Sequence, residues 1–445
     1  MNLRKWLTRN MTSFRVILLG FGSVILLGAA LLSLPSASNN HTSVPFLNAL
    51  FTSVSATCVT GLVVYDTATQ WSFFGKAVIL ILIQIGGLGV VTMSILLMLA
   101  LGRRIGIFQR MAMQDAISAP QIGGIVRFTR FFLAATVIFE GAGLLFLMPP
   151  FIGRFGFWKG TAYALFHSVS AFCNAGFDLM GVQSEYSSFT HFVGDTWLNL
   201  VIMLLIIIGG LGYLTWQDLL NTRFRFRGLR LQSKIILSTS AVLILIPFLY
   251  FVLLEFKDMP LKERILASLF QSVTPRTAGF NTVSYGAMSE TGQLITVVLM
   301  LIGGAPGSTA GGMKVTTIFA LSSAARKNLR RDNDAVGFRR RLEPDTISNA
   351  FTLLAVYLWL LFLGTVVITT VEHLPVMPVM FECASALGTV GLSVGITPGL
   401  GDVSKLILIS FMFLGRVGGI TIAYAMVRSE GIKNSHLPAE KITVG

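Results

Sequence analysis

The chain has 445 residues, of which 53% are hydrophobic and 12% are charged, and its mean hydropathy is +0.74. Soluble domains carry roughly 25% charged residues, so this composition excludes an ordinary water-soluble globule. The formal net charge of +14 does not indicate nucleic-acid binding, because most basic residues gather in short clusters between apolar runs. We therefore expect a membrane protein that binds no nucleic acid.

Long apolar runs alternate with short ones along the chain. The long runs approach the ~20 residues that cross a hydrocarbon core, and they cover roughly 14–34, 75–100, 129–148, 196–217, 234–254, 292–325, 349–371 and 404–427. The short segments are too short to cross and are expected to be re-entrant helices: 45–56, 160–171, 262–273 and 376–387. The first run could also be a signal peptide, but its apolar part is long for that role. This alternation predicts an all-α polytopic membrane protein.

Basic residues cluster at Arg4–Arg15, Arg103–Arg130, Arg223–Lys234, Arg326–Arg341 and Arg428–Lys441. Each cluster follows an even number of long runs. The positive-inside rule then predicts that both termini are cytoplasmic and that the short segments enter from outside. Contact with anionic lipid explains most clusters, and docking of a cytoplasmic partner is an open alternative for the longest one, Arg326–Arg341.

One unit recurs four times: a long run, a short segment, a loop ending on glycine and a second long run. The units cover 1–104, 105–229, 230–344 and 345–445. Irregular backbone at membrane depth persists only where it lines an aqueous path or is buried in protein. One such loop could be an ordinary turn, but four in register predict a ring of carbonyls around a cation. The predicted ion-binding filter is Cys58, Val59, Thr60, Gly61; Cys173, Asn174, Ala175, Gly176; Arg276, Thr277, Ala278, Gly279; and Gly388, Thr389, Val390, Gly391.

The second long run of each unit carries a glycine pair: Gly86–Gly87, Gly209–Gly210, Gly303–Gly304 and Gly418–Gly419. Close helix packing and a functional bend explain such pairs equally well. The third unit goes further, because its glycines and proline cannot form a continuous helix. We expect an intramembrane loop that forms the gate together with Arg416, and its residues are Gly303, Gly304, Ala305, Pro306, Gly307, Ser308, Thr309, Ala310, Gly311, Gly312 and Lys314. The spacing does not fit a phosphate-binding loop.

Other classes of function have weaker support. Three cysteines are too few for a disulfide framework, and the five histidines lack metal-ligand spacing. No hydrolase or metalloprotease motif is present, so a membrane enzyme is disfavoured and no organic cofactor is expected. A secondary symporter is the other alternative, but such proteins typically contain inverted repeats, whereas these four units share one orientation.

With these motifs the chain resembles the Trk/Ktr/HKT superfamily of potassium transporters, and within it the membrane subunit of the bacterial Ktr system. The resemblance rests on the single filter glycines, the broken run of the third unit and Arg416, and it covers essentially the whole chain. It implies a pseudo-fourfold, potassium-channel-like pore for K⁺, with Na⁺ as a second candidate ion. It also implies a homodimer in the lipid bilayer of the bacterial plasma membrane, controlled by a cytoplasmic ring of KtrA-type nucleotide-binding (RCK) subunits.

Four charged residues at membrane depth carry separate expectations. Arg276 would repel cations in the pore, so we expect it to point behind the filter and pair with Glu382. Arg416 is placed in register with Gln84, Ile207 and Leu301, below the filter, where it hinders cations or else pairs with a buried acid. Glu140 and Glu382 are functional candidates, or they pair with a buried arginine or a backbone donor.

Overall fold

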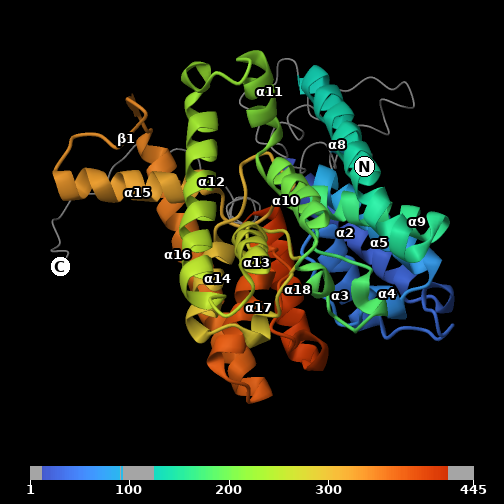
Figure 1. Cartoon of the computed structure of the whole chain (residues 1–445). Helices are drawn as coiled ribbons and strands as arrows, with labels where there is room; N and C mark the ends of the chain where they lie inside the picture. Colours follow the sequence, from blue (N-terminus) through green and yellow to red (C-terminus); the bar gives the residue numbers. More distant parts are fainter. Residues whose placement is uncertain (1–12, 91, 94–124, 419–445) are drawn as a thin grey trace, which may run out of the picture.

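The computed structural model describes residues 13–90, 92–93 and 125–418 (Figure 1). Several predicted features lie outside the described residues: the basic residues Arg4–Arg9, Arg103–Arg110 and Arg428–Lys441, Gly419, and the ends of runs 75–100 and 404–427. The sidedness of the two termini therefore stays a prediction.

The chain folds into α-helices of 4 to 31 residues. Four of them stand where re-entrant segments are expected and are named the short helices: Phe46–Thr57, Phe157–Phe172, Leu261–Val273 and Val376–Gly388. The first part contains α2 (Ser13–Leu32), α3 (Phe46–Thr57), α4 (Thr67–Gln70) and α5 (Phe73–Leu88). The second contains α8 (Ile125–Phe155), α9 (Phe157–Phe172), α10 (Thr196–Gly210) and α11 (Tyr213–Asn221). The third contains α12 (Leu231–Tyr250) with a π-helical turn (Phe251–Glu255), α13 (Leu261–Val273), α14 (Glu290–Leu301) and α15 (Val315–Arg330). The last contains α16 (Pro344–Glu372), α17 (Val376–Gly388) and α18 (Asp402–Val417).

Small elements join these helices. A two-stranded antiparallel hairpin, β1 (Val336–Gly337) and β2 (Arg340–Arg341), follows α15. Single 3₁₀ turns occupy Pro35–Ala37, Met180–Val182, Thr190–Phe192, Phe226–Gly228, Tyr285–Ala287 and Thr397–Gly399.

The expectation of a continuous helix over run 196–217 is wrong. In the described part of the chain, three helices are long and apolar enough to cross a bilayer alone: Arg127–Phe155, Leu231–Glu255 and Pro344–Glu372. The run 196–217 is bent by 94° between α10 and α11. The run 292–325 is broken between α14 and α15, and α15 lies across the direction of α12, which it contacts (Figure 1). Both breaks coincide with glycines, and the break in run 292–325 also contains a proline. Neither residue favours a helix interior.

Polar side chains cap the N-termini of three helices: α5, α10 and α14. Ser72 accepts the N–H of Gly75 at the start of α5, Asp195 accepts the N–H of Leu198 at α10, and Ser289 accepts the N–H of Gly292 at α14. Each of these caps satisfies a backbone donor that would otherwise lack a partner in the first turn. The caps fix where these helices begin, and hence how the preceding loops are closed.

The helices pack in a closed circle. Within the parts, α3 lies against α2 and α5, α9 against α8 and α10, α13 against α12, and α17 against α16 and α18. Between the parts, α5 contacts α9, α10 contacts α13, α14 contacts α17, and α18 returns to contact α3. The four short helices are therefore each held between a helix of their own part and one from the preceding part.

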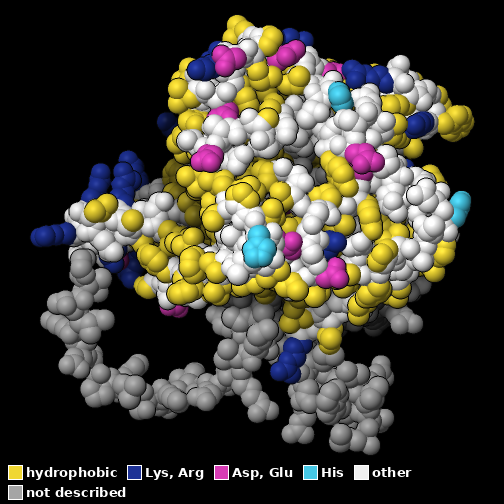
Figure 2. All heavy atoms as spheres, turned by 90° about the horizontal axis from the view of Figure 1, so that it is seen from below, with side chains coloured by type: hydrophobic (Ala, Val, Ile, Leu, Met, Phe, Trp, Pro, Cys, Tyr) yellow, Lys and Arg dark blue, Asp and Glu magenta, His cyan; other side chains and the backbone are white. Residues whose placement is uncertain are grey.

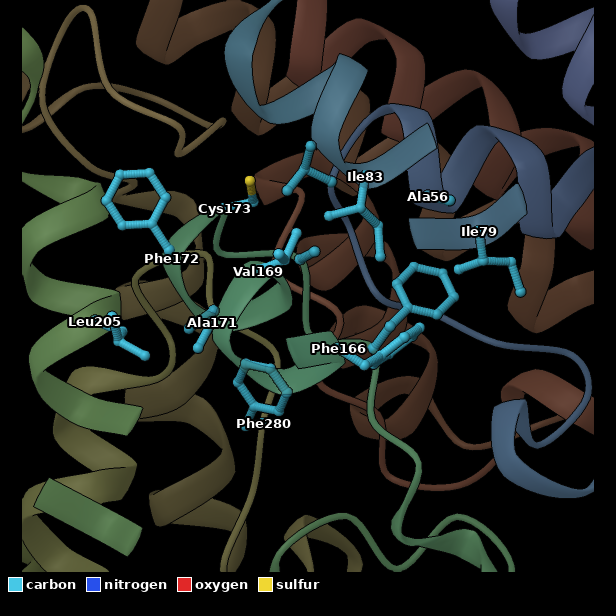
Figure 3. Packing of buried hydrophobic residues seen from close by; sticks show 14 of the residues in the cluster. Ala56, Ile79, Ile83, Phe166, Val169, Ala171, Phe172, Cys173, Leu205 and Phe280 are labelled. Carbon is cyan, nitrogen blue, oxygen red and sulfur yellow. The ribbon is translucent and has the colours of Figure 1, made fainter. Parts of the chain in front are cut away.

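The buried core surrounds the short helices. Figure 3 shows Ile79 and Ile83 of α5 on one side of α9 and Leu205 of α10 on the other, with Phe280 nearby. Outward-facing apolar side chains remain exposed on the three long helices, less than a third of which is buried. Such broad apolar surface is typical of lipid contact, and the chain is a multi-pass membrane protein. In Figure 2 the view from below shows hydrophobic side chains interspersed with polar surface, and Lys and Arg side chains project at one side.

Candidate ion pathway

The last glycine of each predicted filter loop has left-handed backbone. The φ angles are +93° at Gly61, +69° at Gly176, +82° at Gly279 and +93° at Gly391. The residue two places earlier is also left-handed in every loop, and these residues are Val59, Asn174, Thr277 and Thr389. All four loops thus share one backbone pattern, with positive φ at the glycine and at the residue two places before it. At the last position, glycine is the residue that adopts a positive φ without strain.

The four loops touch one another in a ring. A Cβ on Gly61 would lie 2.5 Å from the carbonyl oxygen of Ala175, and one on Gly176 would lie 2.8 Å from the Cα of Gly279. A Cβ on Gly279 would lie 2.5 Å from the carbonyl oxygen of Val390. A Cβ on Gly391 would collide with the carbonyl oxygen of Thr60, which closes the circle. Backbone meets backbone at every step, so no side chain fits at these glycines.

A hydroxyl near the end of each short helix holds the loop that follows. The backbone N–H groups of Gly61 and Gly391 donate to Ser55 Oγ and Ser385 Oγ, each at 3.0 Å. The other two hydroxyls donate instead, Ser170 to the carbonyl of Phe177 at 2.7 Å and Thr274 to that of Phe280 at 2.6 Å. The sequence motif contained these hydroxyl residues without revealing that they brace the loop.

The third loop is one residue tighter than the others. In the first, second and fourth loops the residue before the glycine donates its N–H to a carbonyl five positions back, as Thr60 does to Ser55. In the third, Ala278 donates to Thr274, four positions back. In the fourth loop, Gly388 still belongs to α17 and packs against the carbonyl of Met300 on α14. The predicted filter segments are thus equivalent only in their last three residues.

A cavity of about 530 Å³ opens on one side of the glycine ring. The last glycine of each predicted filter loop lines it, together with the residue two places after each: Val63, Asp178, Asn281 and Ser393. Asp66 also lines it and joins two loops, accepting the N–H of Ala68 at 2.9 Å and, on its other oxygen, the N–H of Tyr186 at 3.0 Å. Neither aspartate was predicted from the sequence. A signal was present for Asp178, because the equivalent positions Asn281 and Ser393 are also polar.

The Asp178 carboxyl lies in the connection after the second filter loop, outside the helices. Its Oδ1 accepts the N–H of Met180 at 2.8 Å. Desolvation raises the pKa of Asp178 to about 7, and the nearby carboxylate of Asp66 shifts it in the same direction. The negative charge of the cavity therefore changes near neutral pH.

The Gly303–Lys314 loop covers the opposite side of the ring. Its neck is closed by the N–H of Gly303 donating to the carbonyl of Met313 at 2.7 Å. At its tip, Thr309 Oγ1 donates at 3.1 Å to the carbonyl of Phe172, the last residue of α9. A Cβ on Gly311 would collide with the side chain of the filter residue Thr389. The loop therefore abuts residues that precede the filter glycines, whereas the cavity exposes the glycines themselves.

The same loop is also tied to the neighbouring broken helix. The N–H of Ala305 donates to the carbonyl of Gly210 at 2.9 Å, and the N–H of Tyr213 donates to the carbonyl of Gly307 at 2.8 Å. Lys314 Nζ turns back onto the loop and donates to the carbonyl of Ala310 at 2.7 Å. These bonds satisfy backbone groups that would otherwise be buried without partners.

Arg416 connects the loop to α5. Its guanidinium donates to the carbonyl of Thr309 on the loop and to those of Gly86 and Gly87 on α5, the last at 3.3 Å. The ion pairs found in the described part of the chain are Arg154–Asp195 and Arg341–Asp334, so Arg416 is bound there by carbonyls and not by a carboxylate. The alternative of a buried acidic partner for Arg416 has no support among these residues.

The predicted register of Arg416 is wrong. A Cβ on three glycines would collide with a carbonyl at the end of the short helix of the same unit: Gly86 with Thr57, Gly209 with Phe172 and Gly415 with Leu387. Each is followed three residues later by a glycine with positive φ: Gly89, Gly212 and Gly418. Arg416 therefore stands level with Gly87 and Gly210, and not with Gln84, Ile207 and Leu301. The prediction placed Gly418 at the first glycine of each pair because the surrounding apolar residues are similar, and this shifted Arg416 by three residues.

Two kinds of glycine occur near the ends of these helices. Gly86, Gly209 and Gly415 permit close packing of backbone on backbone. Gly89, Gly212 and Gly418 end or break the helix through their positive φ. Close packing thus accounts for the first set of glycines, and a functional role for the breaks three residues later stays a prediction.

The predicted pairing of Arg276 with Glu382 is also wrong. The Arg276 guanidinium is buried and donates at 2.8 Å to Ser240 Oγ on α12, which agrees with a side chain directed behind the filter. Glu382 is occupied by donors from its own unit: Ser393, Val394 and Thr397. The sequence could not decide this, because the partner of a buried charge depends on which helix lies behind the loop.

Glu140 of α8 lies between two units. It accepts from Gln84 Nε2 of α5 at 3.2 Å, and Cys173 Sγ, the first residue of the second predicted filter segment, lies 3.8 Å from its other oxygen. The expected alternatives were a buried arginine or a backbone donor, and the structure shows a side-chain amide instead. The carboxyl thus joins α5, α8 and the base of the second loop.

Comparison with known proteins decides the family. Residues 9–434 match the family described as TrkH, cation transport protein. The chain belongs to this family of cation transport proteins. It is 38% identical over 432 residues to Ktr system potassium uptake protein B of Bacillus subtilis (strain 168), covering 96% of this chain and 95% of that protein. It is 36% identical over 456 residues to potassium/sodium uptake protein NtpJ of Enterococcus hirae, covering 100% and 99%.

A solved structure supports the fold. The potassium transporter TrkH from Vibrio parahaemolyticus is similar with a TM-score of 0.73 at 19% identity, over 94% of this chain and 86% of that one. The similarity to the Trk/Ktr superfamily predicted from the sequence is confirmed, and the family is one of transporters and not of enzymes.

Proposed function

We propose that this protein is the ion-translocating membrane subunit of a potassium uptake system, with Na⁺ as a second ion that it transports or that activates it. The names of the two relatives motivate the choice of ions, potassium for one and potassium/sodium for the other. The observation that carries the proposal is the ring of four left-handed glycines at the base of a cavity with acidic side chains.

In this proposal the chain consists of four repeats, 1–104, 105–229, 230–344 and 345–445, around a pseudo-fourfold pore. The cyclic contacts of the short helices with the preceding units support it. Carbonyls of Thr60, Ala175, Ala278 and Val390 lie at the glycine ring and would replace the water shell of a dehydrated cation. The C-terminal ends of the short helices add partial negative charge. Each loop has one filter glycine where potassium channels have two, so we expect moderate discrimination against Na⁺.

The gate in this proposal combines Arg416 with the Gly303–Lys314 loop. Both lie on the side of the ring opposite the cavity, and they are hydrogen-bonded to each other through the carbonyl of Thr309. A guanidinium there repels cations. The loop can move away only if its bonds to Gly210, Phe172 and Arg416 break together, and a cytoplasmic partner pulling on α15 would supply that force.

The regulatory part of the proposal follows from the family and the charge pattern. We place the protein as a homodimer in a bacterial plasma membrane, with both termini and the basic segments Arg223–Lys234 and Arg326–Arg341 in the cytoplasm. A KtrA-type nucleotide-binding ring would dock on that face. Similarity to proteins of a Ktr system motivates such a partner.

Uptake in cells tests the proposal. The chain is expressed, with and without a KtrA-type partner, in bacteria that lack their own potassium uptake systems, and ⁸⁶Rb⁺ uptake is measured with and without Na⁺. Growth at low K⁺ and saturable uptake are expected, with Na⁺ changing the rate. An enzyme or a transporter of organic solutes would not rescue growth, and that result would reject the proposal.

A further inference from the structure

A polar residue occupies the same place on all four short helices. Counting back nine residues from the filter glycine gives Thr52, His167 and Glu382; in the tighter third loop, eight residues give Gln271. All four side chains are buried, with relative exposures of 2%, 0%, 1% and 0% for Thr52, His167, Glu382 and Gln271. Burying polar groups is costly unless they are hydrogen-bonded, so their partners show what each one does.

Glu382 makes the most bonds, and all of them reach the chain that leaves the fourth filter loop. Its Oε1 accepts from Ser393 Oγ at 2.6 Å and from the N–H of Val394 at 3.1 Å. Its Oε2 accepts from Thr397 Oγ1 at 2.7 Å. These three donors hold both carboxyl oxygens of Glu382 against the outgoing chain, and no lysine or arginine of the described chain forms an ion pair with it.

Gln271 and His167 contact the outgoing chain of their own units in the same way. Gln271 Nε2 donates to the carbonyl of Val283 at 3.0 Å and its Oε1 accepts from Tyr285 OH at 2.5 Å. His167 Nε2 accepts the N–H of Leu179 at 3.1 Å, while Nδ1 lies 2.7 Å from the carbonyl of Tyr163, which requires the Nδ1–H tautomer.

Thr52 is the exception. Its hydroxyl donates at 3.0 Å to the carbonyl of Asn48 in its own helix, so it does not hold the outgoing chain. The number of bonds from this position to the outgoing chain therefore falls from three at Glu382 to two at Gln271, one at His167 and none at Thr52.

We propose that Glu382, Gln271 and His167 are positioning residues that fix the outer half of the ion path. The segments they hold carry residues that line the cavity: Ser393 and Val394, Ser284 and Tyr285, and Asp178. The inference rests on the proposed cation function. Because the bonds differ among units, the four quarters of the path differ in rigidity, and the fourth quarter contributes most to cation affinity.

The test compares conservative variants by ⁸⁶Rb⁺ uptake, separating the KM from the maximal rate at equal membrane expression. Glu382→Gln keeps the shape of the side chain but replaces one accepting oxygen by an NH₂ group, which cannot accept. We expect its KM to rise roughly three- to tenfold, since a buried donor of the outgoing chain loses its acceptor. Glu382→Asp keeps both accepting oxygens on a shorter side chain and should retain part of the affinity. Gln271→Leu and His167→Phe should raise the KM less, in that order.

Thr52→Val is the matched control at the same position and should leave the KM unchanged. Thr397→Val removes one donor to Glu382 from the loop side, so it provides an independent variant if Glu382→Gln does not reach the membrane. Its KM should rise by less than that of Glu382→Gln. Equal KM values for wild type, Glu382→Gln and Thr397→Val would overturn the inference. Absence of uptake by the wild type would instead reject the proposed function, so the two failures are distinguishable.

Discussion

The two sides of the glycine ring are built on opposite principles. On the cavity side, four loops with different side chains repeat one backbone conformation and meet one another through backbone atoms. On the other side, a single loop from the third unit and a single arginine from the fourth cross several units. In the proposed pore, repetition suits a site made of carbonyls, because each quarter would present the same groups. The proposed movable barrier needs only one element that differs from the rest.

The two sides of the ring also differ in the residue types of their loops. The predicted filter loops carry Cys, Asn, Ala or Val at equivalent positions, whereas the contacts between loops at their glycines are made by backbone atoms. The Gly303–Lys314 loop instead has small residues at most positions, because it fits between Thr389, Phe172 and the broken helix α10–α11. We therefore expect substitutions on the cavity side to change ion preference and substitutions on the loop side to change the rate of flux.

The largest effect is expected at the filter glycines. Gly391→Ser or Gly61→Ser places a Cβ against a carbonyl of the next loop at a φ of +93°, and left-handed backbone alone costs about 1–2 kcal/mol for such a residue. Preference for K⁺ over Na⁺ should fall by tenfold or more while the protein is still expressed. Competition of Na⁺ with ⁸⁶Rb⁺ uptake measures this.

Gly22→Ala is the matched control, because a Cβ on this helical glycine of α2 meets no atom within 4 Å. It should transport as the wild type does. Unchanged affinities for both ions in the serine variants of Gly61, Gly176, Gly279 and Gly391 would show that these loops are not the filter.

The next largest effect is expected on the loop side. Arg416→Ser removes the guanidinium that links Thr309 to α5, and deletion of Gly304–Gly311 removes the loop itself. Either change should raise ⁸⁶Rb⁺ flux several-fold and make it less dependent on the cytoplasmic partner. Arg154→Ser, at a half-exposed arginine paired with Asp195, serves as the control and should not change flux. Lower flux with lower expression from both changes would mean that Arg416 and the loop are structural.

A smaller effect is expected at the packing glycines. Gly86→Ala, Gly209→Ala and Gly415→Ala each force a methyl group against a carbonyl at the end of a short helix, and overpacking of this kind costs about 1–3 kcal/mol. The thermal midpoint of the purified protein in detergent should fall, with Gly141→Ala unchanged because its Cβ has open space. If all four variants unfold at the same temperature, the helices are not packed at these glycines as described.

A still smaller effect concerns the charge of the cavity. Below a pH of about 7 Asp178 is protonated, so the cavity attracts cations less strongly, and the KM for uptake should rise as the pH falls from 8 to 6. Asp178→Asn should have a higher KM at pH 8 and a flatter pH dependence. A wild-type KM that does not change with pH, or an equally steep dependence in Asp178→Asn, would argue against this role.

The smallest effect is expected behind the third loop. Because Arg276 bonds Ser240 and not Glu382, the effects of Arg276→Gln and Glu382→Gln on uptake should be additive. Arg276→Gln and Ser240→Ala should instead show a coupling of about 0.5 kcal/mol or more in a double-mutant cycle. Coupling in the first pair with additivity in the second would contradict the observed contacts.

The sequence by itself determined much of this protein. Hydrophobic run length predicted the positions of the short helices, because an apolar segment of about 12 residues cannot cross a bilayer. The recurring glycines predicted the loops that follow them, since glycine marks backbone that other residues resist. Together with Arg416 and the interrupted third run, these local features were sufficient to predict the family.

Only the tertiary structure decided which groups meet. The 94° bend after α10, the true register of Arg416 and the partners of Arg276 and Glu382 all depend on segments distant in the chain. Asp66 and Asp178 could be assigned to one cavity only because the folded chain brings the four loops together. A sequence pattern records the propensity of each segment, whereas a buried polar side chain takes whichever partner packing brings within hydrogen-bonding distance.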